Sequence, residues 1–295
     1  MTPTDNRAQA AAPLLDDAQT DRIAEVLRTP FEVLSVVPST NDELVERAQR
    51  AARTGRPLPD LSLLAAEHQS AGRGRLDRQW VTGPGEALTF SLLLRPARGS
   101  GSTAVALPTQ SFPWLTMLLA AAIAQTLRGQ GIAASLKWPN DVLVETGGGS
   151  RKICGVLASL VVHDGSAPAL VLGAGLNVAA APEGAASVRG EGSEASRGDL
   201  LVEILERFTC LYRLFAESPE SLSGSGELRE EVEQLLSTLG RRVRAEMPGG
   251  RAPLEGVAAG LDEHGALLID HDGGRTAVSA ADVVHLRPVE EGDRA

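Results

Sequence analysis

The sequence predicts an α+β domain followed by a small all-β domain. Helix-like and strand-like segments alternate as far as Leu239, and beyond Gly240 only short β-like runs occur, between turns rich in Gly, Asp and Pro. A length of 295 residues suits about two domains of roughly 150 residues each. We therefore expect an N-terminal tail and short helix over 1–30, a mixed sheet with flanking helices over 31–239 and a β-barrel over 240–291.

The segment before Ser135 carries signals for helices and for strands. Residues 1–12 are polar and Ala-rich, which indicates disorder. Leu14 to Leu27 has apolar residues at helical spacing, and Thr40-Asn41-Asp42-Glu43 has the form of a capping box in which Thr40 is the N-cap. Pro113 and Gly129 bracket a strongly apolar helix. Apolar runs predict strands at Phe31–Val37, Leu61–Glu67 and Ala87–Leu94, with a polar loop rich in Gly and Arg at His68–Gly85.

The segment after Ser135 predicts further strands, a loop, helices and the barrel. Turns at Gly147–Gly149 and Asp164-Gly165 separate strands at Ser135–Trp138, Val142–Glu145, Lys152–Val162 and Ala169–Asn177. Residues 180–198 are almost wholly Ala, Gly, Ser, Glu and Arg, which predicts a flexible loop. Helices follow over Asp199–Ala216 and Glu227–Leu239, with Gly240 as C-cap. The barrel strands are expected at Val243, Leu254–Ala258, Ala266–Ile269, Thr276–Val278 and Val283–Leu286.

Composition and charge exclude several classes of function. The chain has 38 acidic and 28 basic residues and a net charge of −10, which disfavours general binding to nucleic acids. No apolar run approaches the roughly 20 residues that span a bilayer, and the N-terminus does not read as a signal peptide. The two cysteines, Cys154 and Cys210, form neither a disulfide framework nor a zinc-binding pattern. We expect a cytoplasmic protein that does not act at a membrane.

The motifs of common nucleotide-binding loops and hydrolases are absent. No Walker A loop, G-x-G-x-x-G, G-x-S-x-G or H-E-x-x-H occurs, so a nucleotide would need another scaffold. The lysines are informative instead, because only Lys137 and Lys152 occur among the 28 basic residues. Codon bias towards Arg explains most of this imbalance. It does not explain why the remaining lysines share one short segment, and we infer that a site there needs a point charge.

The segment from Glu67 to Trp80 is suited to binding an anion. Gly72 and Gly74 flank Arg73, so the backbone can approach a ligand while the guanidiniums of Arg73 and Arg75 grip phosphate or carboxylate oxygens. Trp80 offers a ring that could stack on a base. A solvated loop or an RNA-binding patch are the alternatives, and the acidic surroundings weigh against the second.

A second segment brings a carboxylate near a lysine. The turn at Gly147–Gly149 folds the strand after Asp141 back beside the strand of Lys152, which suits a phosphate bound with a metal ion. The alternative is a surface ion pair on a hairpin. A third segment, Leu172–Asn177, has small residues against which a planar group can lie, or which permit a tight strand crossing. Cys154 is expected to be a small buried residue rather than a nucleophile.

Taken in order and spacing, these motifs resemble the biotin protein ligases, also called biotin–[acetyl-CoA-carboxylase] ligases. The resemblance covers about residues 31–290 and implies a class II synthetase-like catalytic domain that binds biotin and ATP, followed by an SH3-like barrel. It rests on Ser39-Thr40-Asn41, on Gln69 with Ala71-Gly72-Arg73-Gly74-Arg75, on Lys137-Trp138-Pro139-Asn140-Asp141, on Arg151-Lys152-Ile153-Cys154-Gly155, and on Gly173-Ala174-Gly175-Leu176-Asn177.

The resemblance also implies a reaction and a set of site residues. Biotin is activated with ATP and Mg²⁺ as biotinyl-5′-AMP and is then transferred to a lysine of a biotin carboxyl carrier domain. Lys152, Arg75 and Asp141 would be catalytic, and Asp141 would hold the metal. Biotin would contact Ser39, Thr40, Asn41, Gln69, Arg73, Gly74, Arg75 and Lys152. The nucleotide would contact Arg73, Arg75, Arg78, Trp80, Lys137, Asn140 and Asn177.

Some features separate alternatives within and beyond this family. If Thr40 caps the helix its hydroxyl is committed, which leaves Ser39 and Asn41 as the surer ligands. Only 38 residues precede Ser39, so we expect no helix-turn-helix domain, no DNA binding, and a monomer or weak homodimer. Lipoate ligases and octanoyltransferases of the same fold lack the paired G-R-G-R and K-W-P-N-D motifs. A non-catalytic biotin sensor would have no need of Asp141 and Lys152 together.

Overall fold

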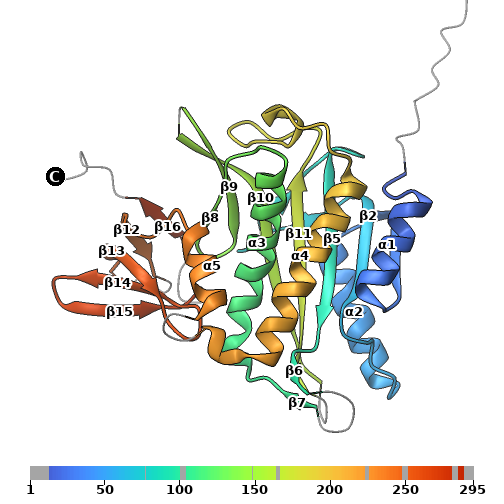
Figure 1. The fold of residues 1–295 in the computed structure, drawn as a ribbon, viewed down its shortest axis with the longest axis horizontal. Helices are drawn as coiled ribbons and strands as arrows, with labels where there is room; N and C mark the ends of the chain where they lie inside the picture. Colours follow the sequence, from blue (N-terminus) through green and yellow to red (C-terminus); the bar gives the residue numbers. More distant parts are fainter. Residues whose placement is uncertain are drawn as a thin grey trace, which may run out of the picture.

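The structure, a computed structural model, describes residues 13–76, 78–99, 104–147, 149–163, 167–222, 226–247, 252–280 and 285–288. Our expectations for residues 1–12, for the turn at Asp164-Gly165 and for the first half of Val283–Leu286 fall outside these ranges. The described chain forms a seven-stranded sheet with helices on both faces and a five-stranded sheet beside it (Figure 1). The predicted order of an α+β domain and a small all-β domain is confirmed.

The larger sheet is mixed because only one of its strand pairs is parallel. In the order β1-β2-β5-β11-β10-β9-β8, β1 runs parallel to β2 and every other neighbouring pair is antiparallel. The strands span Phe31–Val37 (β1), Ser62–Gln69 (β2), Ala87–Leu94 (β5), Ala169–Asn177 (β11), Gly149–Val161 (β10), Asp141–Thr146 (β9) and Ala134–Lys137 (β8).

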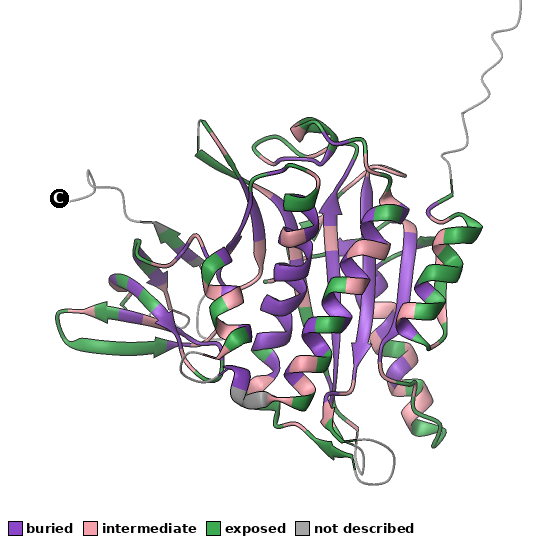
Figure 2. Ribbon diagram, viewed as in Figure 1, coloured by how far each residue is buried: buried purple, intermediate pink, exposed green. Residues whose placement is uncertain are grey.

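Helices cover both faces of this sheet, which explains its long apolar strands. On one face lie α1 (Asp17–Leu27), α3 (Phe112–Gly129), α4 (Arg197–Glu217) and α5 (Glu227–Leu235), and on the other lies α2 (Thr40–Arg53). Leu63 therefore packs into the core of α3 and α4, whereas Leu64 packs under α2. Every residue of β5 is buried, because a strand covered on both faces has no solvent side (Figure 2). Among the described residues, no helix has the length and apolar character of a membrane crossing.

The C-terminal sheet is antiparallel, in the order β15-β14-β13-β12-β16. Its strands span Arg242–Glu246 (β12), Leu254–Leu261 (β13), Leu267–His271 (β14), Gly274–Val278 (β15) and His285–Pro288 (β16). Buried tryptophans attach its β13–β14 turn to the larger domain. The indole N–H of Trp114 donates to the Glu263 carbonyl at 3.0 Å, and that of Trp138 donates to the Gly265 carbonyl at 3.1 Å.

Short elements connect the larger ones. The loop predicted at His68–Gly85 contains a small hairpin, because β2 continues to Gln69 and β3 (Gly72–Arg73) pairs with β4 (Gln79–Trp80). A second small hairpin joins β6 (Ala97–Arg98) to β7 (Val105–Ala106). Short 3₁₀ helices lie at Thr109–Ser111, Arg189–Glu191 and Pro219–Leu222.

Two helix boundaries differ from the prediction because tertiary contacts decide them. The N-cap of α2 is Ser39 rather than Thr40, and its side chain accepts from the Asp42 N–H at 3.3 Å. The helix α5 ends at Leu235 rather than Leu239, because Leu236 is extended and bridges to Leu136 of β8. Gly240 still has a positive φ of 75°, but it does not cap the helix.

The segment predicted as a flexible loop, 180–198, is packed against the sheet instead. Ala185 bridges to Lys152 of β10, and the next residue, Ala186, is buried together with Val188. The last residues of the segment already belong to α4, which begins at Arg197 rather than Asp199 with Ser196 as its N-cap. The sequence could not predict this packing, because small side chains are scattered among polar ones here and show no apolar periodicity.

Candidate active site

Three glycines in β10 and β11 leave space on the face of the sheet that α2 covers. Gly155 of β10 and Gly175 of β11 are register partners, and Gly173 pairs with Ser91 of β5. A Cβ on Gly155 would lie 2.9 Å from the Lys152 Nζ, and one on Gly175 would lie 2.6 Å from the Trp80 ring. One on Gly173 would lie 3.1 Å from the side-chain nitrogen of Asn41. Each glycine makes room for a polar or aromatic side chain, and the planar group expected against Leu172–Asn177 includes the Trp80 indole itself.

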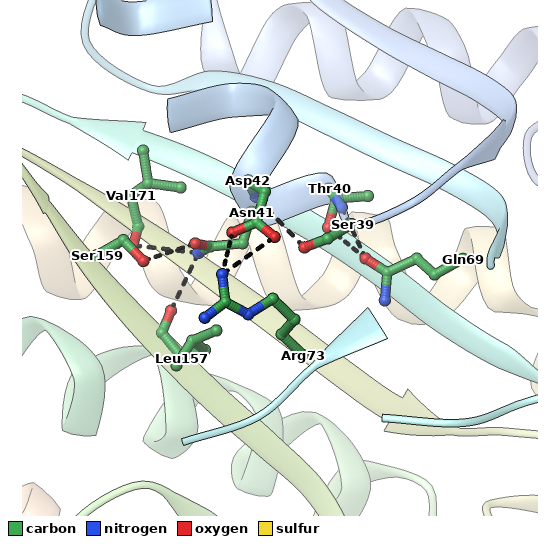
Figure 3. A network of polar contacts seen from close by, with 9 residues as sticks. All are labelled: Ser39, Thr40, Asn41, Asp42, Gln69, Arg73, Leu157, Ser159 and Val171. Carbon is green, nitrogen blue, oxygen red and sulfur yellow. Dashed lines mark hydrogen bonds and ion pairs between the residues drawn. The ribbon is translucent and has the colours of Figure 1, made fainter. Parts of the chain in front are cut away.

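The first cavity, which we call the α2 pocket, lies at the N-terminus of α2. The buried part of its polar lining comes from Ser39, Thr40, Asn41 and Gln69. Gln69 Oε1 accepts from the Thr40 backbone N–H at 2.7 Å and from the Thr40 hydroxyl at 3.0 Å (Figure 3). The helix therefore begins where β2 ends, and a hydrogen bond to the last residue of β2 holds it there.

The Asn41 amide closes the far end of the α2 pocket. Its Oδ1 accepts from the Ser159 hydroxyl at 2.6 Å, and its Nδ2 donates to the Leu157 and Val171 carbonyls at 3.4 and 3.5 Å (Figure 3). These bonds span β10 and β11 over the space left by Gly173. Our reason for preferring Ser39 and Asn41 to Thr40 was therefore wrong, because the capping hydroxyl is that of Ser39 and the Asn41 amide is engaged with strands.

The hairpin of β3 and β4 lies over this pocket. Arg73 forms an ion pair with Asp42 at 3.2 Å, which ties the hairpin to the first turn of α2 (Figure 3). A Cβ on Gly72 would lie 2.5 Å from the Trp80 carbonyl, so the close pairing of β3 with β4 requires glycine there. Leu76, near the tip, has a positive φ of 56°, which is uncommon for a residue with a side chain.

Arg75 connects the hairpin with two other parts of the molecule. Its guanidinium donates to the Asn140 side-chain oxygen at 3.1 Å and to the Ala280 carbonyl, in the C-terminal domain, at 2.7 Å. Burial lowers the pKa of Arg75 below its ordinary value, although the nearby Asp141 carboxylate opposes that shift. The guanidinium nevertheless stays charged at neutral pH.

Lys152 and Asp141 meet as the sequence predicts. The Lys152 Nζ lies 2.6 Å from the Asp141 Oδ1 and 5.9 Å from the Trp80 ring centroid. The two strands are neighbours, and Asp141 is the register partner of Gly155. The register between β9 and β10 shifts between Lys152 and Cys154, directly after the lysine. The predicted juxtaposition is therefore confirmed, and it lies between two cavities rather than on an open hairpin.

The second cavity, which we call the hairpin cavity, has a volume of about 310 Å³. It collects most of the residues expected at the nucleotide: Arg75, Arg78, Trp80, Lys137, Asn140 and Asn177, with Asp141 and Lys152. Arg73 lines the α2 pocket instead. Asn177 is buried, and its Oδ1 has no hydrogen-bond partner in the described part of the chain, so it is available to a ligand.

The two cavities meet at a shared wall. Gly74, Arg75, Trp80, Asn140 and Lys152 line both of them. An acid whose ring lies in the α2 pocket and a nucleotide in the hairpin cavity would bring a carboxylate and a phosphate together at Lys152. Proximity and stabilisation of developing phosphate charge are what an adenylation step needs.

The donor set fits a magnesium ion that arrives with phosphates. No group of three His, Cys, Asp or Glu side chains that could hold a metal occurs within the described ranges. Asp141 alone faces the hairpin cavity with a carboxylate. Mg²⁺ usually keeps several waters and binds through one or two carboxylates plus substrate phosphates, so a lone Asp141 is compatible with it.

Cys154 and two serines, Ser91 and Ser159, also lie near the site. Cys154 is fully buried, as expected, and burial raises the pKa of its thiol to about 12. Our sequence reasoning did not single out Ser91 or Ser159. Ser91 could have been found as the hydroxyl in the middle of the apolar run Ala87–Leu94, whereas Ser159 carries no local signal.

Comparisons with known proteins agree with this geometry. The model of the biotin/lipoate A/B protein ligase family matches residues 33–177, and that of the biotin protein ligase C terminal domain matches residues 238–286. The chain is 33% identical over 265 residues to the biotin–[acetyl-CoA-carboxylase] ligase of Mycobacterium tuberculosis, covering 87% of this chain and 89% of that one. It is 30% identical to the protein of that name from Paracoccus denitrificans, covering 85% and 98%. The biotin protein ligase of Aquifex aeolicus in complex with biotin and ATP superposes with a TM-score of 0.66 and 25% identity, covering 88% and 99%.

Proposed function

We propose, on the premise that the chain belongs to the biotin protein ligases of the biotin/lipoate A/B protein ligase family, that it joins biotin to a lysine of a biotin carboxyl carrier protein with cleavage of ATP. The observation that carries the proposal is the meeting of the α2 pocket and the hairpin cavity at Lys152, with Asp141 beside it.

The reaction has an activation step and a transfer step. A carboxylate oxygen of biotin attacks the α-phosphorus of ATP, and the bond from that phosphorus to the bridging oxygen breaks. The products are biotinyl-5′-AMP and pyrophosphate. The ε-amine of the carrier lysine then attacks the acyl carbon, an amide forms, AMP leaves with the bonding electron pair, and the amine loses a proton.

Charged residues at the shared wall carry the first step. Lys152 holds the attacking carboxylate beside the α-phosphate and stabilises the charge that develops on the phosphate oxygens. Arg75, fixed between Asn140 and Ala280, presents a second cation from the hairpin. Arg73, the last residue of β3, and Gly74, which follows it, close over the intermediate.

The remaining residues bind the two substrates. Ser39, Thr40, Asn41 and Gln69 surround the ureido ring. Asn41, whose amide oxygen is hydrogen-bonded to Ser159, forms part of the pocket wall. Arg78, Trp80, Lys137, Asn140 and Asn177 contact the nucleotide. Asp141 would hold Mg²⁺, and the ion would supply further neutralisation of phosphate charge.

We extend the proposal to partners and organisation. The acceptor is a carboxylase carrier domain, as the names of the relatives indicate for those proteins. The chain acts in the cytoplasm as a monomer or weak homodimer and does not bind DNA, in keeping with its net charge of −10. Residues 31–239 form the catalytic domain and 240–291 the C-terminal domain. Tight DNA binding in a gel-shift assay at physiological salt would contradict this part.

Pyrophosphate release from ATP and Mg²⁺ tests the function directly. Biotin, lipoate and octanoate are compared with the purified full chain, and a carrier domain is then added to detect labelling of its lysine. We expect release with biotin alone, followed by labelling. Release with lipoate or octanoate alone would move the chain to the other branch of the family. Binding of biotin without turnover would indicate a sensor.

A further inference from the structure

Ser91 is a buried hydroxyl in the apolar middle of β5. Its side chain is fully buried, while its neighbours Phe90 and Leu92 pack into the core on the opposite face of the sheet. It lies in register with Gly173, which lines the α2 pocket. A hydroxyl is retained at such a place where it has a specific partner, and the partner of Ser91 is the Thr40 hydroxyl at 2.9 Å.

The directions of the hydrogen bonds in this chain of contacts follow from one backbone group. The Thr40 backbone N–H can only donate, so the atom of Gln69 that it meets at 2.7 Å is the amide oxygen. The Thr40 hydroxyl lies 3.0 Å from the same oxygen and must donate to it. Because its only proton is then used, the Thr40 oxygen can only accept from Ser91. The relay therefore runs from Ser91 to Thr40 to Gln69.

This relay determines what the pocket presents to a ligand. The Gln69 Nε2, turned away from Thr40, remains as a donor, and a Cβ on Gly72 would lie 2.8 Å from it. The Thr40 oxygen keeps one lone pair and no proton, so it remains an acceptor. Both residues line the α2 pocket. The pocket thus offers a donor and an acceptor side by side, in a polarity that cannot be exchanged.

We propose that Ser91 is a positioning residue whose hydroxyl holds the Thr40 oxygen in this relay, so that the α2 pocket selects the adjacent N–H and C=O groups of a cyclic urea. The ureido N–H donates to the Thr40 oxygen, and the ureido carbonyl accepts from the Gln69 Nε2. An alkyl or dithiolane tail offers neither group and would leave both buried partners unpaired, which disfavours octanoate and lipoate. This inference rests on the proposed function, in which the α2 pocket takes the biotin ring.

A matched pair of variants tests the role of Ser91. Ser91→Ala removes the relay hydroxyl, and the control Thr89→Val removes a buried hydroxyl from the same strand and face that donates only to the Ala66 carbonyl. We expect Ser91→Ala to raise the KM for biotin by about tenfold with kcat kept within about twofold, the size of one lost hydrogen bond. Thr89→Val should leave both constants unchanged, with a similar loss of Tm. A purely structural role would move Tm alike and spare the KM.

An exchange of polarity provides an independent measurement. In Gln69→Glu the first carboxylate oxygen still accepts from Thr40, but the second replaces the donor by an acceptor. The probe is 2-iminobiotin, in which a protonated nitrogen replaces the ureido oxygen at neutral pH. We expect the wild type to prefer biotin and Gln69→Glu to prefer 2-iminobiotin, with the ratio of kcat/KM values shifting by about 100-fold or more.

The outcomes separate the two proposals. If Gln69→Glu and Thr40→Val raise the KM for biotin but Ser91→Ala behaves like Thr89→Val, the role of Ser91 is overturned while the proposed function stands. If no variant at Ser91, Thr40 or Gln69 changes that KM although biotin still drives pyrophosphate release, biotin lies elsewhere and both the polarity and the pocket assignment fall. If Gln69→Glu does not fold, Thr40→Val and Ser91→Ala carry the test.

Discussion

The α2 pocket and the hairpin cavity are neighbours, yet their side chains are held in different ways. In the α2 pocket Thr40, Asn41 and Gln69 are nearly fully buried, and neutral hydrogen bonds to strands and to each other fix them. On the side of the hairpin the functional groups are cations. Arg73 and Lys152 keep 51% and 40% of their side-chain surface exposed, and each pairs with a carboxylate.

This difference separates recognition from chemistry. A network of buried neutral groups is rigid and complementary to one ligand before that ligand arrives. Half-exposed ion pairs contribute little to stability, so a phosphate or carboxylate of a ligand can replace the aspartate partner of either cation at small free-energy cost. We therefore expect changes in the α2 pocket to alter affinity for biotin, and changes on the hairpin side to alter turnover or affinity for ATP.

The largest effect is expected for Lys152→Arg. The charge is kept, but a planar guanidinium is no substitute for the single Nζ that lies between Asp141 and Gly155. We predict a loss of kcat for pyrophosphate release of about 100-fold or more, with little change in the KM for biotin. Lys137→Arg is the control, with a loss below about tenfold. Turnover near the wild-type rate in Lys152→Arg would remove this lysine from the mechanism.

A pair of glycine variants sharpens the comparison most directly. In Gly175→Ala the new methyl group must displace the Trp80 ring, whereas in Gly173→Ala it presses on Asn41 and Ser91. We predict that Gly175→Ala raises the KM for ATP by about tenfold and Gly173→Ala raises the KM for biotin by about tenfold. Steady-state kinetics with each substrate varied in turn checks this. Gly147→Ala is the control, because a Cβ there would meet open space. Equal effects of the two variants on the KM for ATP and the KM for biotin would contradict the distinction between the two cavities.

A smaller, several-fold effect is expected in hydrogen exchange. The hairpin has only short strands, Gly72–Arg73 and Gln79–Trp80, whereas the first turn of α2 is anchored to Gln69. Segments with few protected backbone hydrogen bonds open readily. We predict that biotinyl-5′-AMP slows exchange across residues 68–80 and leaves the N-terminus of α2 almost unchanged. Exchange in the hairpin that the ligand does not affect would contradict a closing loop.

The sequence predicted those features that local patterns encode. Apolar runs located the strands of the larger sheet, and the glycine turn at Gly147–Gly149 was enough to bring Asp141 and Lys152 together. Composition located the C-terminal sheet. In each case the determinant lies within a few residues of the feature, so no knowledge of distant contacts was needed.

Features decided by distant contacts could not be predicted. Ser39 and Thr40 each precede an acidic residue by three positions, and the contact of the Thr40 N–H with Gln69, 29 residues away, leaves Ser39 to cap the helix. Arg75 reaches the Ala280 carbonyl across 205 residues. The relay through Ser91 likewise joins three separate elements. Such contacts depend on the packing of the sheet, and no motif records them.

The smallest effect on activity is expected for Cys154→Ala, although this residue follows Lys152 closely. Its thiol is buried with a pKa raised to about 12, against an ordinary 9.0, so it is neutral and inaccessible. We predict kcat/KM within about twofold of wild type, and alkylation at pH 8 of the exposed Cys210 alone. Because the pKa of the thiol is higher in the folded than in the unfolded state, its contribution to the free energy of unfolding is fully present below pH 9. This contribution is lost as the pH rises towards 12. Cys154→Ala should therefore reduce the loss of Tm at alkaline pH. Alkylation of Cys154 in the folded wild type would contradict the prediction that this thiol is inaccessible.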